Sequence, residues 1–499
     1  MVLRFLMLLA CLMVLFSCNK KENEVAHPNI IYILADDLGY GDVAACNPAS
    51  KIQTPHIDAL AQQGILFSDV HSGSAVCTPT RYGVLTGRYS WRTRLQQGVL
   101  WSYDTLLIDP ARTTVATLLK KQGYHTACIG KWHLGLGWQA NGTPIPDLVQ
   151  PISSGPNDVG FDESFIIPAS LDIPPYFYLR NDRVTSTQVD TIDATTGLGF
   201  WRRGPIASGF SHEAVLPDLT KEAVQYIQER GAAKDPFFLY LPLPAPHTPV
   251  LPVEAFQGKS AVGPYGDFVM MVDDVVRQIV EAVAAAGLTD NTLIIFTSDN
   301  GCAPAGGFKD LQAMGHDPSA GFRGHKADIY EGGHRIPFIA KWPAKVKAGS
   351  RSDETLCLTD LLATVADITG MPLKDDEGED SYSFLPVLLG KEYPTPLREA
   401  TVHHSVHGAF AIRKGKWKLI FSKGSGGWSY PTPAQADTLD LPPLQLYDLS
   451  VDRAEQQNVS TTFPDTVQAL TTLMQKLIQE GRSTPGTTQK NEVEVVLMK

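Results

Sequence analysis

The sequence has few cysteines, and their number and spacing exclude several classes of protein. Only seven occur in 499 residues, and two of them lie near the N-terminus. The five that remain are an odd and sparse set, which argues against a disulfide-stabilised scaffold. No pair is spaced as C-x-x-C, which argues against a structural zinc site or a redox dithiol. We expect Cys46, Cys128, Cys302 and Cys357 to be buried thiols.

An excess of positive charge is also lacking. The chain has 42 Lys and Arg against 53 Asp and Glu, which gives a formal net charge of −11. A nucleic-acid-binding protein needs a basic face, so we expect no nucleic-acid partner. An acidic chain can still bind an anion, provided that local cations or a metal ion surround it.

Long hydrophobic runs are lacking after the N-terminus. The run over residues 5–16 is too short to span a bilayer and has the length of a signal-peptide core. It leads into Leu15-Phe16-Ser17-Cys18, which resembles a bacterial lipoprotein box. We predict a signal peptide over 1–17 and a linker over 18–27, with the Cys18 lipid as the membrane contact; a plain secretory signal is the alternative. Either way we expect export, to the periplasm or the outer membrane of a Gram-negative bacterium.

Strand and helix patterns alternate over residues 28–380, the predicted catalytic domain. Apolar runs such as NIIYILA (29–35) and TLIIFTS (292–298) are typical of parallel strands covered on both faces. Amphipathic helices separate them, for example TPHIDALAQQG (54–64), in which Thr54 is a plausible N-cap. This repeated winding predicts an α/β fold with a mainly parallel sheet sandwiched by helices.

Two segments depart from this pattern. Residues 138–215 are rich in Pro, Gly and polar side chains, and we expect a long loop insertion near the ligand-binding rim. Residues 381–499 contain strand patterns with a tight turn at Lys414-Gly415, followed by a closing helix. They predict a smaller C-terminal α+β subdomain with an antiparallel sheet.

Acidic side chains follow two of the predicted strands where each one ends. Asp36 and Asp37 follow the first strand, and Asp299 and Asn300 follow a later one. Ligands of open α/β sheets bind beyond the carboxyl ends of the strands, so we expect these groups to converge. An all-oxygen set suits a hard divalent cation, calcium before magnesium. A single Asp-Asp pair would more often be an exposed turn, but two pairs after buried strands favour a metal site.

Basic side chains are placed in the same way. Lys131 and His133 follow a strand in GKWHLG, and His247 follows another in PAPHTP. Arg81 and Lys326 come from separate segments. If the five groups converge, they form a pocket for a tetrahedral oxyanion opposite the metal, although each Lys or Arg alone is more often a solvated surface group.

The stretch SAVCTPTRYGVLTGRY contains Cys77, which could be half of a disulfide, a thiolate nucleophile, a metal ligand or something less usual. Residues 77–88 look like the signature of the type I sulfatases, the formylglycine-dependent sulfuric ester hydrolases of the alkaline phosphatase superfamily. Thr80 stands where that family more often has serine or alanine. NIIYILADDLGYGD, GKWHLG, PHTP, TSDNG and GFRGHKADIYEGGHRIP match in order, and the plan resembles arylsulfatase A and N-acetylgalactosamine-sulfatases.

The resemblance implies a chemistry for Cys77. A maturase oxidises this residue to Cα-formylglycine before export, and the aldehyde hydrates to a diol. One hydroxyl attacks the sulfur of the ester, and the other later allows sulfate to leave. The resemblance also implies one calcium ion that Asp36, Asp37, Asp299 and Asn300 bind together with the modified residue 77. Asp299 would also be the base for the attacking hydroxyl.

The resemblance implies the remaining roles as well. Arg81 anchors the diol, and Lys131 and Lys326 neutralise sulfate oxygens and so contact the substrate. His247 protonates the leaving sugar oxygen, and His133 takes the proton from the second hydroxyl during sulfate release.

The substrate is expected to be a carbohydrate sulfate, by family analogy. Galactose or N-acetylgalactosamine 4-O or 6-O sulfate in glycosaminoglycan, mucin or algal glycan fits best, attacked from the chain end. His403, His404 and His407 in HHSVHG could reach the rim and bind sugar, with His404 the chosen candidate, or could form an ordinary polar loop. The alternatives are a phosphodiesterase or phosphonate monoester hydrolase of the same superfamily, and a glycan-binding lipoprotein with a dead site.

Overall fold

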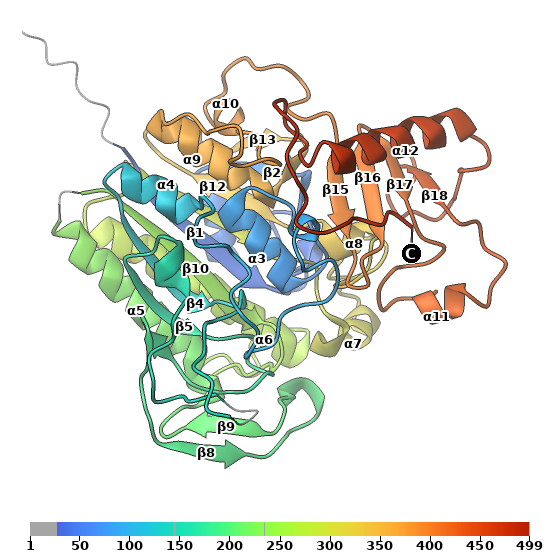
Figure 1. Ribbon diagram of the computed structural model, residues 1–499. Coiled ribbons are helices and arrows are strands. Elements are labelled where there is room, and N and C mark those ends of the chain that lie inside the picture. The colour runs from blue at the N-terminus through green and yellow to red at the C-terminus, as the bar shows by residue number, and fades with distance from the viewer. Residues whose placement is uncertain (1–26, 143–145, 234, 499) are drawn as a thin grey trace, which may run out of the picture.

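The computed structural model describes residues 27–142, 146–233 and 235–498, and a ten-stranded sheet forms its centre (Figure 1). The predicted signal peptide, Cys18 and the linker up to residue 26 lie outside the described residues. In order across the sheet, the strands are β13 (Ser350–Ser352), β2 (Ile65–Phe67), β12 (Phe338–Lys341), β11 (Thr292–Ser298), β1 (Asn29–Asp36), β10 (Phe237–Pro246), β4 (His125–Lys131), β5 (Glu163–Ile167), β6 (Leu179–Arg180) and β7 (Arg183–Val184).

The five central strands are parallel. β1 pairs in parallel with β10 and β11, β10 with β4, and β4 with β5. Antiparallel pairs occur toward the edges, where β12 joins β11 to β2 and β6 pairs with β5 and β7. The prediction of a mainly parallel sheet is confirmed. Because the central strands run the same way, their carboxyl ends meet along one edge of the sheet.

Helices cover both faces of this sheet. Every residue of β1 is buried, with Ile31 and Ile33 in one hydrophobic cluster and Ile30 and Leu34 in the other. This division follows the two-residue alternation of a strand. The first face packs against α2 (Pro55–Gln62), α5 (Val215–Gly231) and α6 (Gly263–Ala285). The second packs against α3 (Cys77–Thr86), α4 (Val115–Lys121), α9 (Leu361–Thr369) and α10 (Leu385–Leu388).

Thr54 precedes α2, as predicted, but its side chain does not cap the helix. The hydroxyl of Thr54 instead accepts a hydrogen bond from Ala44 N at 3.1 Å. The first free amides of α2, on His56 and Ile57, donate to the carboxylate of Asp273 in α6. Asp273, 217 positions after His56, therefore caps the helix in place of Thr54. No pattern in the neighbouring sequence could have indicated this contact.

The predicted loop insertion over residues 138–215 is wrong in part. β5, β6 and β7 lie inside it and extend the central sheet, and β8 (Val189–Ile192) pairs with β9 (Gly204–Ala207) in a separate hairpin. The longest of these strands has five residues, too few to produce a clear apolar period among the Gly and Pro of the intervening turns. Backbone pairing with β4, rather than local pattern, makes β5 a strand.

The predicted C-terminal antiparallel sheet is confirmed. It comprises β15 (Thr401–His404), β16 (Phe410–Lys414), β17 (Trp417–Ile420) and β18 (Gln445–Asp448), and α12 (Pro464–Gln479) packs on it. The first strand of this sheet begins at Thr401, and α10, which precedes it, packs with α9. The remaining short elements are β3 (Val70–His71), β14 (Leu356–Cys357), α7 (Phe308–Ala313), α8 (Glu331–His334) and α11 (Pro433–Ala436).

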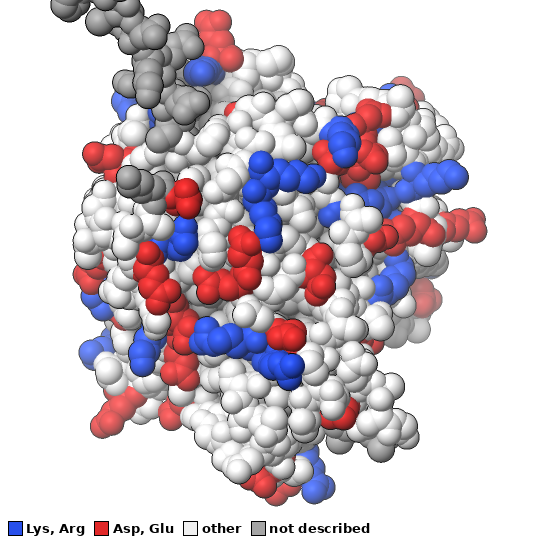
Figure 2. Space-filling view, turned by 60° about the vertical axis from the view of Figure 1, so that its left-hand side comes forward, with Lys and Arg blue, Asp and Glu red and all other residues white. Residues whose placement is uncertain are grey.

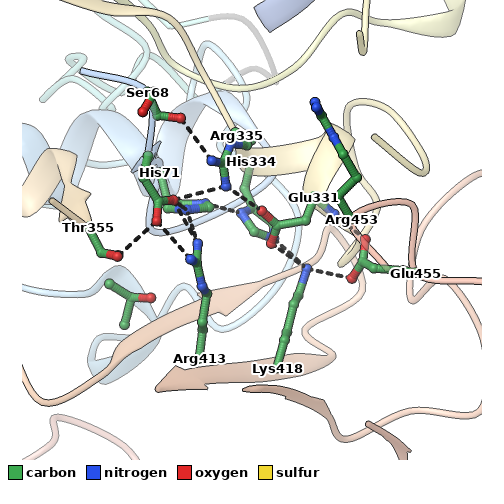
Figure 3. Close-up of polar contacts among 12 residues, drawn as sticks. Ser68, His71, Glu331, His334, Arg335, Thr355, Arg413, Lys418, Arg453 and Glu455 are labelled. Carbon is green, nitrogen blue, oxygen red and sulfur yellow. Dashed lines mark hydrogen bonds and ion pairs between the residues drawn. The ribbon is translucent and has the colours of Figure 1, made fainter. Parts of the chain in front are cut away.

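Buried ion pairs join this subdomain to the catalytic body. Arg413 donates two hydrogen bonds of 2.7 Å to Asp69, and Lys418 lies 3.0 Å from Glu331 and 2.8 Å from Glu455. Figure 3 shows Arg413 and Lys418 reaching up from neighbouring strands, with Lys418 between the two glutamates. Loss of one partner would leave a buried charge unpaired, so these contacts restrict how the two parts dock.

On the face seen in Figure 2, acidic and basic side chains lie side by side, and no broad patch of one sign covers that face. The helices in the described part of the chain include none that is long and apolar enough to cross a membrane.

Arg92, just after α3, ties three parts of the chain together. Its Nε and Nη2 donate to the two carboxylate oxygens of Asp380 at 2.8 and 2.9 Å, and its Nη1 donates to Leu477 O and Asn491 Oδ1. The side chains of Arg92 and Asp380 are fully buried. The C-terminal tail is thereby held against the segment that follows the Cys77 helix.

We expect Arg92→Ala to lower the free energy of unfolding by about 3–5 kcal/mol, because it leaves the Asp380 charge buried and unpaired. Lys414→Ala is the matched control, since Lys414 and Glu399 form an ion pair that is half exposed, and it should cost less than about 1 kcal/mol. Urea denaturation measures both. Equal losses for the two variants would contradict the structural importance of the buried pair.

Candidate active site

Ten side chains from separate segments converge at the carboxyl edge of the parallel strands. Each is at most 8% exposed, so they share an environment with little water. The sequence predicted this convergence, and the structure brings together Asp36, Asp37, Cys77, Arg81, Lys131, His133, His247, Asp299, Asn300 and Lys326.

The oxygen atoms of this site fit a hard cation. The ligand atoms of Asp36, Cys77 and Asp299 all lie within 4.8 Å of one another. Asn300 donates its amide N–H to Asp37 Oδ1 at 2.7 Å, which assigns the orientation of the amide. Asp36 Oδ1 and Asn300 Oδ1 are buried and have no hydrogen-bond partner among the described residues. Buried oxygens of this kind are the ligands that calcium prefers.

Each aspartate of the site has a cationic partner. Three buried carboxylates in one place repel one another, so they need an equal number of positive charges. The closest pairs are Lys131 Nζ with Asp36 Oδ2 at 2.7 Å, Lys326 Nζ with Asp37 Oδ1 at 2.7 Å, and Arg81 Nη2 with Asp299 Oδ2 at 2.7 Å.

Burial and neighbouring charges shift the pKa values of two aspartates in opposite directions. Burial alone would raise the pKa of Asp36, but Lys131, His247 and Arg81 lower it well below its usual range. Burial raises the pKa of Asp299, and the negative charge of Asp36 raises it further. Asp36 is therefore a persistent anion, and Asp299 is the carboxylate better suited to accept a proton.

The Cys77 thiol occupies the first turn of α3 and is 2% exposed. Burial raises its pKa, so the unmodified residue stays a thiol and is a weak nucleophile. All five described cysteines are free, which excludes the disulfide interpretation of Cys77. Cys128, Cys302 and Cys357 are buried as predicted, but Cys46 is only partly buried.

His133 is oriented to accept a proton. Its Nε2 lies 2.8 Å from Leu100 O, so Nε2 carries the hydrogen. Its Nδ1 is buried and has no partner among the described residues. Burial, Lys131 and Arg81 lower the pKa of this ring well below its usual value, so it stays neutral with a free lone pair. The Leu100 carbonyl was missed in the sequence, because a backbone acceptor has no residue signature.

His247 is arranged as a donor. Its Nδ1 lies 2.6 Å from Thr248 O, and its Nε2 lies 3.5 Å from Asp37 Oδ2. Thr248 O can only accept, so Nδ1 carries a hydrogen, and Nε2 is left facing a carboxylate. A proton on Nε2 beside the rim is the feature that a general acid needs.

The sugar contacts predicted for His403 and His404 stay predictions, and the structure buries both residues in β15. His403 is fully buried and stacks on His334 at a centroid distance of 4.0 Å, and His404 is only 1% exposed. The carbonyl of His404 accepts a hydrogen bond from Ala75 N at 3.0 Å, so β15 braces the segment before the Cys77 helix. His407 is exposed.

A second group of possible metal ligands does not fit a cation. His71, His334 and His403 bring ring nitrogens within 4.8 Å of one another. The nitrogens already have protein partners, since His71 contacts Asp69 at 2.7 Å and His334 Nδ1 at 3.0 Å. The Lys418 ammonium lies 3.0 Å from His334 Nε2 and would repel a metal ion. This cluster belongs to the interface with the C-terminal subdomain.

The parallel sheet, the buried cations and the set of oxygens that could hold a metal ion fit a hydrolase for an anionic ester. A family model described as Sulfatase matches residues 28–371. The chain therefore belongs to the sulfatase family, and it is a sulfuric ester hydrolase.

Known relatives agree with this assignment along nearly the whole chain. An N-acetylgalactosamine-6-O-sulfatase of Bacteroides thetaiotaomicron is 36% identical over 516 aligned residues, which cover 95% of this chain and 98% of the relative. Human arylsulfatase A is 33% identical, with 89% of this chain and 86% of that protein covered. A solved structure from work on the metabolism of multiple glycosaminoglycans by Bacteroides thetaiotaomicron has a TM-score of 0.81 at 35% identity, covering 90% of this chain and 99% of that chain.

We expect Ca²⁺ to raise the melting temperature of the chelator-treated protein, because a ligand bound to the folded state stabilises it by about 2.7 kcal/mol at 100 times its Kd. Asp36→Asn should abolish most of this shift. Asp193→Asn, at a carboxylate that is 92% exposed, should keep it. Equal shifts in both variants would place the cation elsewhere.

Proposed function

We propose that this sulfatase removes O-sulfate from galactose or N-acetylgalactosamine residues of a glycan. The 6-O position is favoured, because the relative that matches 95% of this chain is an N-acetylgalactosamine-6-O-sulfatase. The 4-O position is the second to test. The substrate could come from glycosaminoglycan, mucin or algal glycan.

The observation that carries this proposal is the set of three cations around Cys77. Lys131, Lys326 and Arg81 are fully or almost fully buried, and each is paired with one of the three carboxylates. A cation held by those carboxylates would offset their charge and leave the positive charges of Lys131, Lys326 and Arg81 available to an anion. Lys131 and Lys326 would neutralise oxygens of the sulfate, and Arg81 would anchor the nucleophile at residue 77. Planar and point cations of this kind are the usual ligands of tetrahedral oxyanions.

The proposed site needs two groups besides the encoded side chains. Asp36, Asp37, Asp299 and Asn300 would hold a calcium ion, which supplies Lewis-acid polarisation of oxygens bound beside it. Cys77, matured by a formylglycine-generating enzyme before export, would supply the hydroxyl nucleophile that a buried thiol cannot.

The chain's own residues move the protons. Asp299 would accept the proton of the nucleophile, consistent with its raised pKa. His247 would donate from Nε2 to the leaving sugar oxygen, and His133 would accept at its free Nδ1 when sulfate is released. A backbone carbonyl holds the hydrogen on one nitrogen of each ring, and the other nitrogen distinguishes the two: Nδ1 of His133 has no partner among the described residues, whereas Nε2 of His247 faces Asp37.

We expect Lys326→Ala to lower kcat/KM on N-acetylgalactosamine 6-sulfate by about 10²- to 10³-fold, because it removes a preorganised charge from the sulfate site. Lys416→Ala, at a half-exposed lysine in the turn between β16 and β17, is the matched control and should leave the activity intact. Parallel assays on a phosphodiester test the competing activity. A preference of the wild type for the phosphodiester would overturn the proposal.

A separate measurement tests the alternative of a glycan-binding lipoprotein without catalytic activity. Mass spectrometry of the peptide carrying Cys77, from protein made in the native host, should show the aldehyde in place of the thiol. An unmodified thiol together with no turnover would favour a glycan-binding lipoprotein.

We also propose that Cys18 anchors the mature protein to the outer membrane through its lipid. The apolar run that ends in the lipoprotein-box resemblance and the polar residues after it support this. Cys18→Ser should move the protein from the membrane pellet to the soluble fraction, and the wild type should incorporate labelled palmitate. Equal fractionation of both proteins would contradict the anchor.

A further inference from the structure

A cavity of about 230 Å³ lies in the C-terminal subdomain, and none of the predicted catalytic residues lines it. Its walls come from the second half of the β15–β16 turn, the loop after β17, α11 and the last described residues. They include His407, Phe421, Lys423, Ala436, Asp437 and Leu497. Nothing in the proposed mechanism uses this cavity.

Three polar side chains of the cavity lack partners. His407, Lys423 and Asp437 are exposed, and none makes a side-chain hydrogen bond or ion pair with another described residue. The donor and acceptor atoms of these three side chains therefore remain available to a ligand in the cavity. Apolar atoms of Phe421 and Leu497 form other parts of the wall. Apolar walls with a few free polar groups are typical of a small-ligand site.

The cavity is joined to the active site by short backbone connections. The Val406 amide donates to Ala327 O at 3.0 Å, directly after Lys326, and the His407 amide donates to Gly426 O at 3.3 Å. The neighbouring His404 carbonyl accepts from Ala75, two residues before Cys77. Three extended residues span at most about 11 Å, so His407 lies close to the braced segment.

An exposed tryptophan lies near the same path. Trp428 is 46% exposed, and its backbone amide donates to Asp328 Oδ1 at 2.8 Å. Asp328 is two residues from Lys326, and Trp428 is two residues from Gly426 in the cavity wall. The exposed ring of Trp428 therefore belongs to the segment that connects the cavity wall with Lys326 and its neighbours.

We propose that this cavity is a second carbohydrate subsite, which binds another sugar residue of the glycan whose sulfated residue lies at Cys77. This inference rests on the proposed function. The volume is below the ~300 Å³ at which pockets for drug-sized ligands begin, so it suits one sugar ring. Lys423, His407 and Asp437 offer both donors and acceptors, as neighbouring sugar hydroxyls require.

The kinetic test compares two substrates of the matured enzyme: N-acetylgalactosamine 6-sulfate and a tetrasaccharide that ends in the same residue. We expect Lys423→Ala and His407→Ala to lower the ratio of tetrasaccharide to monosaccharide kcat/KM by about five- to tenfold, the effect of one lost hydrogen bond. Lys416→Ala removes the same charge elsewhere in the subdomain and should leave the ratio unchanged. An unchanged ratio in all variants, or an equal fall on both substrates, would overturn the subsite.

A binding test separates this inference from the proposed function. Calorimetry should detect the desulfated tetrasaccharide with the wild type and Lys416→Ala, and much weaker binding with Lys423→Ala. Absence of wild-type binding would overturn the subsite even if the sulfatase assay succeeds. Lys423-dependent binding by a protein that hydrolyses no carbohydrate sulfate would overturn the proposed function and uphold the subsite.

Discussion

The structure depends on keeping opposite charges paired in a place from which water is excluded. Asp36, Asp37 and Asp299 cannot be buried together unless Lys131, Lys326 and Arg81 are brought to within hydrogen-bonding distance. These groups come from strands and loops far apart in the chain, so the site exists only when the sheet is assembled. Asp36 Oδ1 and Asn300 Oδ1 accept no hydrogen bond from the described residues, and they are the oxygen atoms best placed to bind a cation.

The rest of the fold can be understood as support for that arrangement. Parallel strands place Asp36, Lys131, His247 and Asp299 at one edge, and helices on both faces keep the strands dry. The C-terminal subdomain adds a second layer of support, because β15 bonds to the segment before Cys77. A separate buried set of ion pairs, with Lys418 at its centre, holds this subdomain in place. Buried ion pairs thus stabilise both the candidate active site and the contact between the two parts of the chain.

Much of the fold and site could be predicted, because the relevant signals are local. Seven-residue apolar runs such as the one that forms β11 identify strands, and the polar groups after them are fixed by chain order. The failures also have physical causes. β5 is too short to show a period and becomes a strand through pairing with β4. Thr54 was a sound local cap, but Asp273 from α6 competes for the same amides.

The sequence by itself determined the family signature around Cys77, the oxygen side chains that could hold a hard cation, the basic side chains that could meet an anion, and a chain that winds as an α/β sheet. Residue type and order are sufficient for these, because they depend on side-chain chemistry and on strand ends. Only the tertiary structure decided which nitrogen of each histidine and which oxygen of Asp36 and Asn300 lacks a hydrogen bond to the described residues. Leu100 O and Thr248 O fix which nitrogen of each histidine carries its hydrogen. Cations from remote segments lower the pKa of Asp36, whereas burial and the charge of Asp36 raise the pKa of Asp299. Hydrogen-bond direction and local potential arise from contacts between remote segments, which no linear pattern encodes.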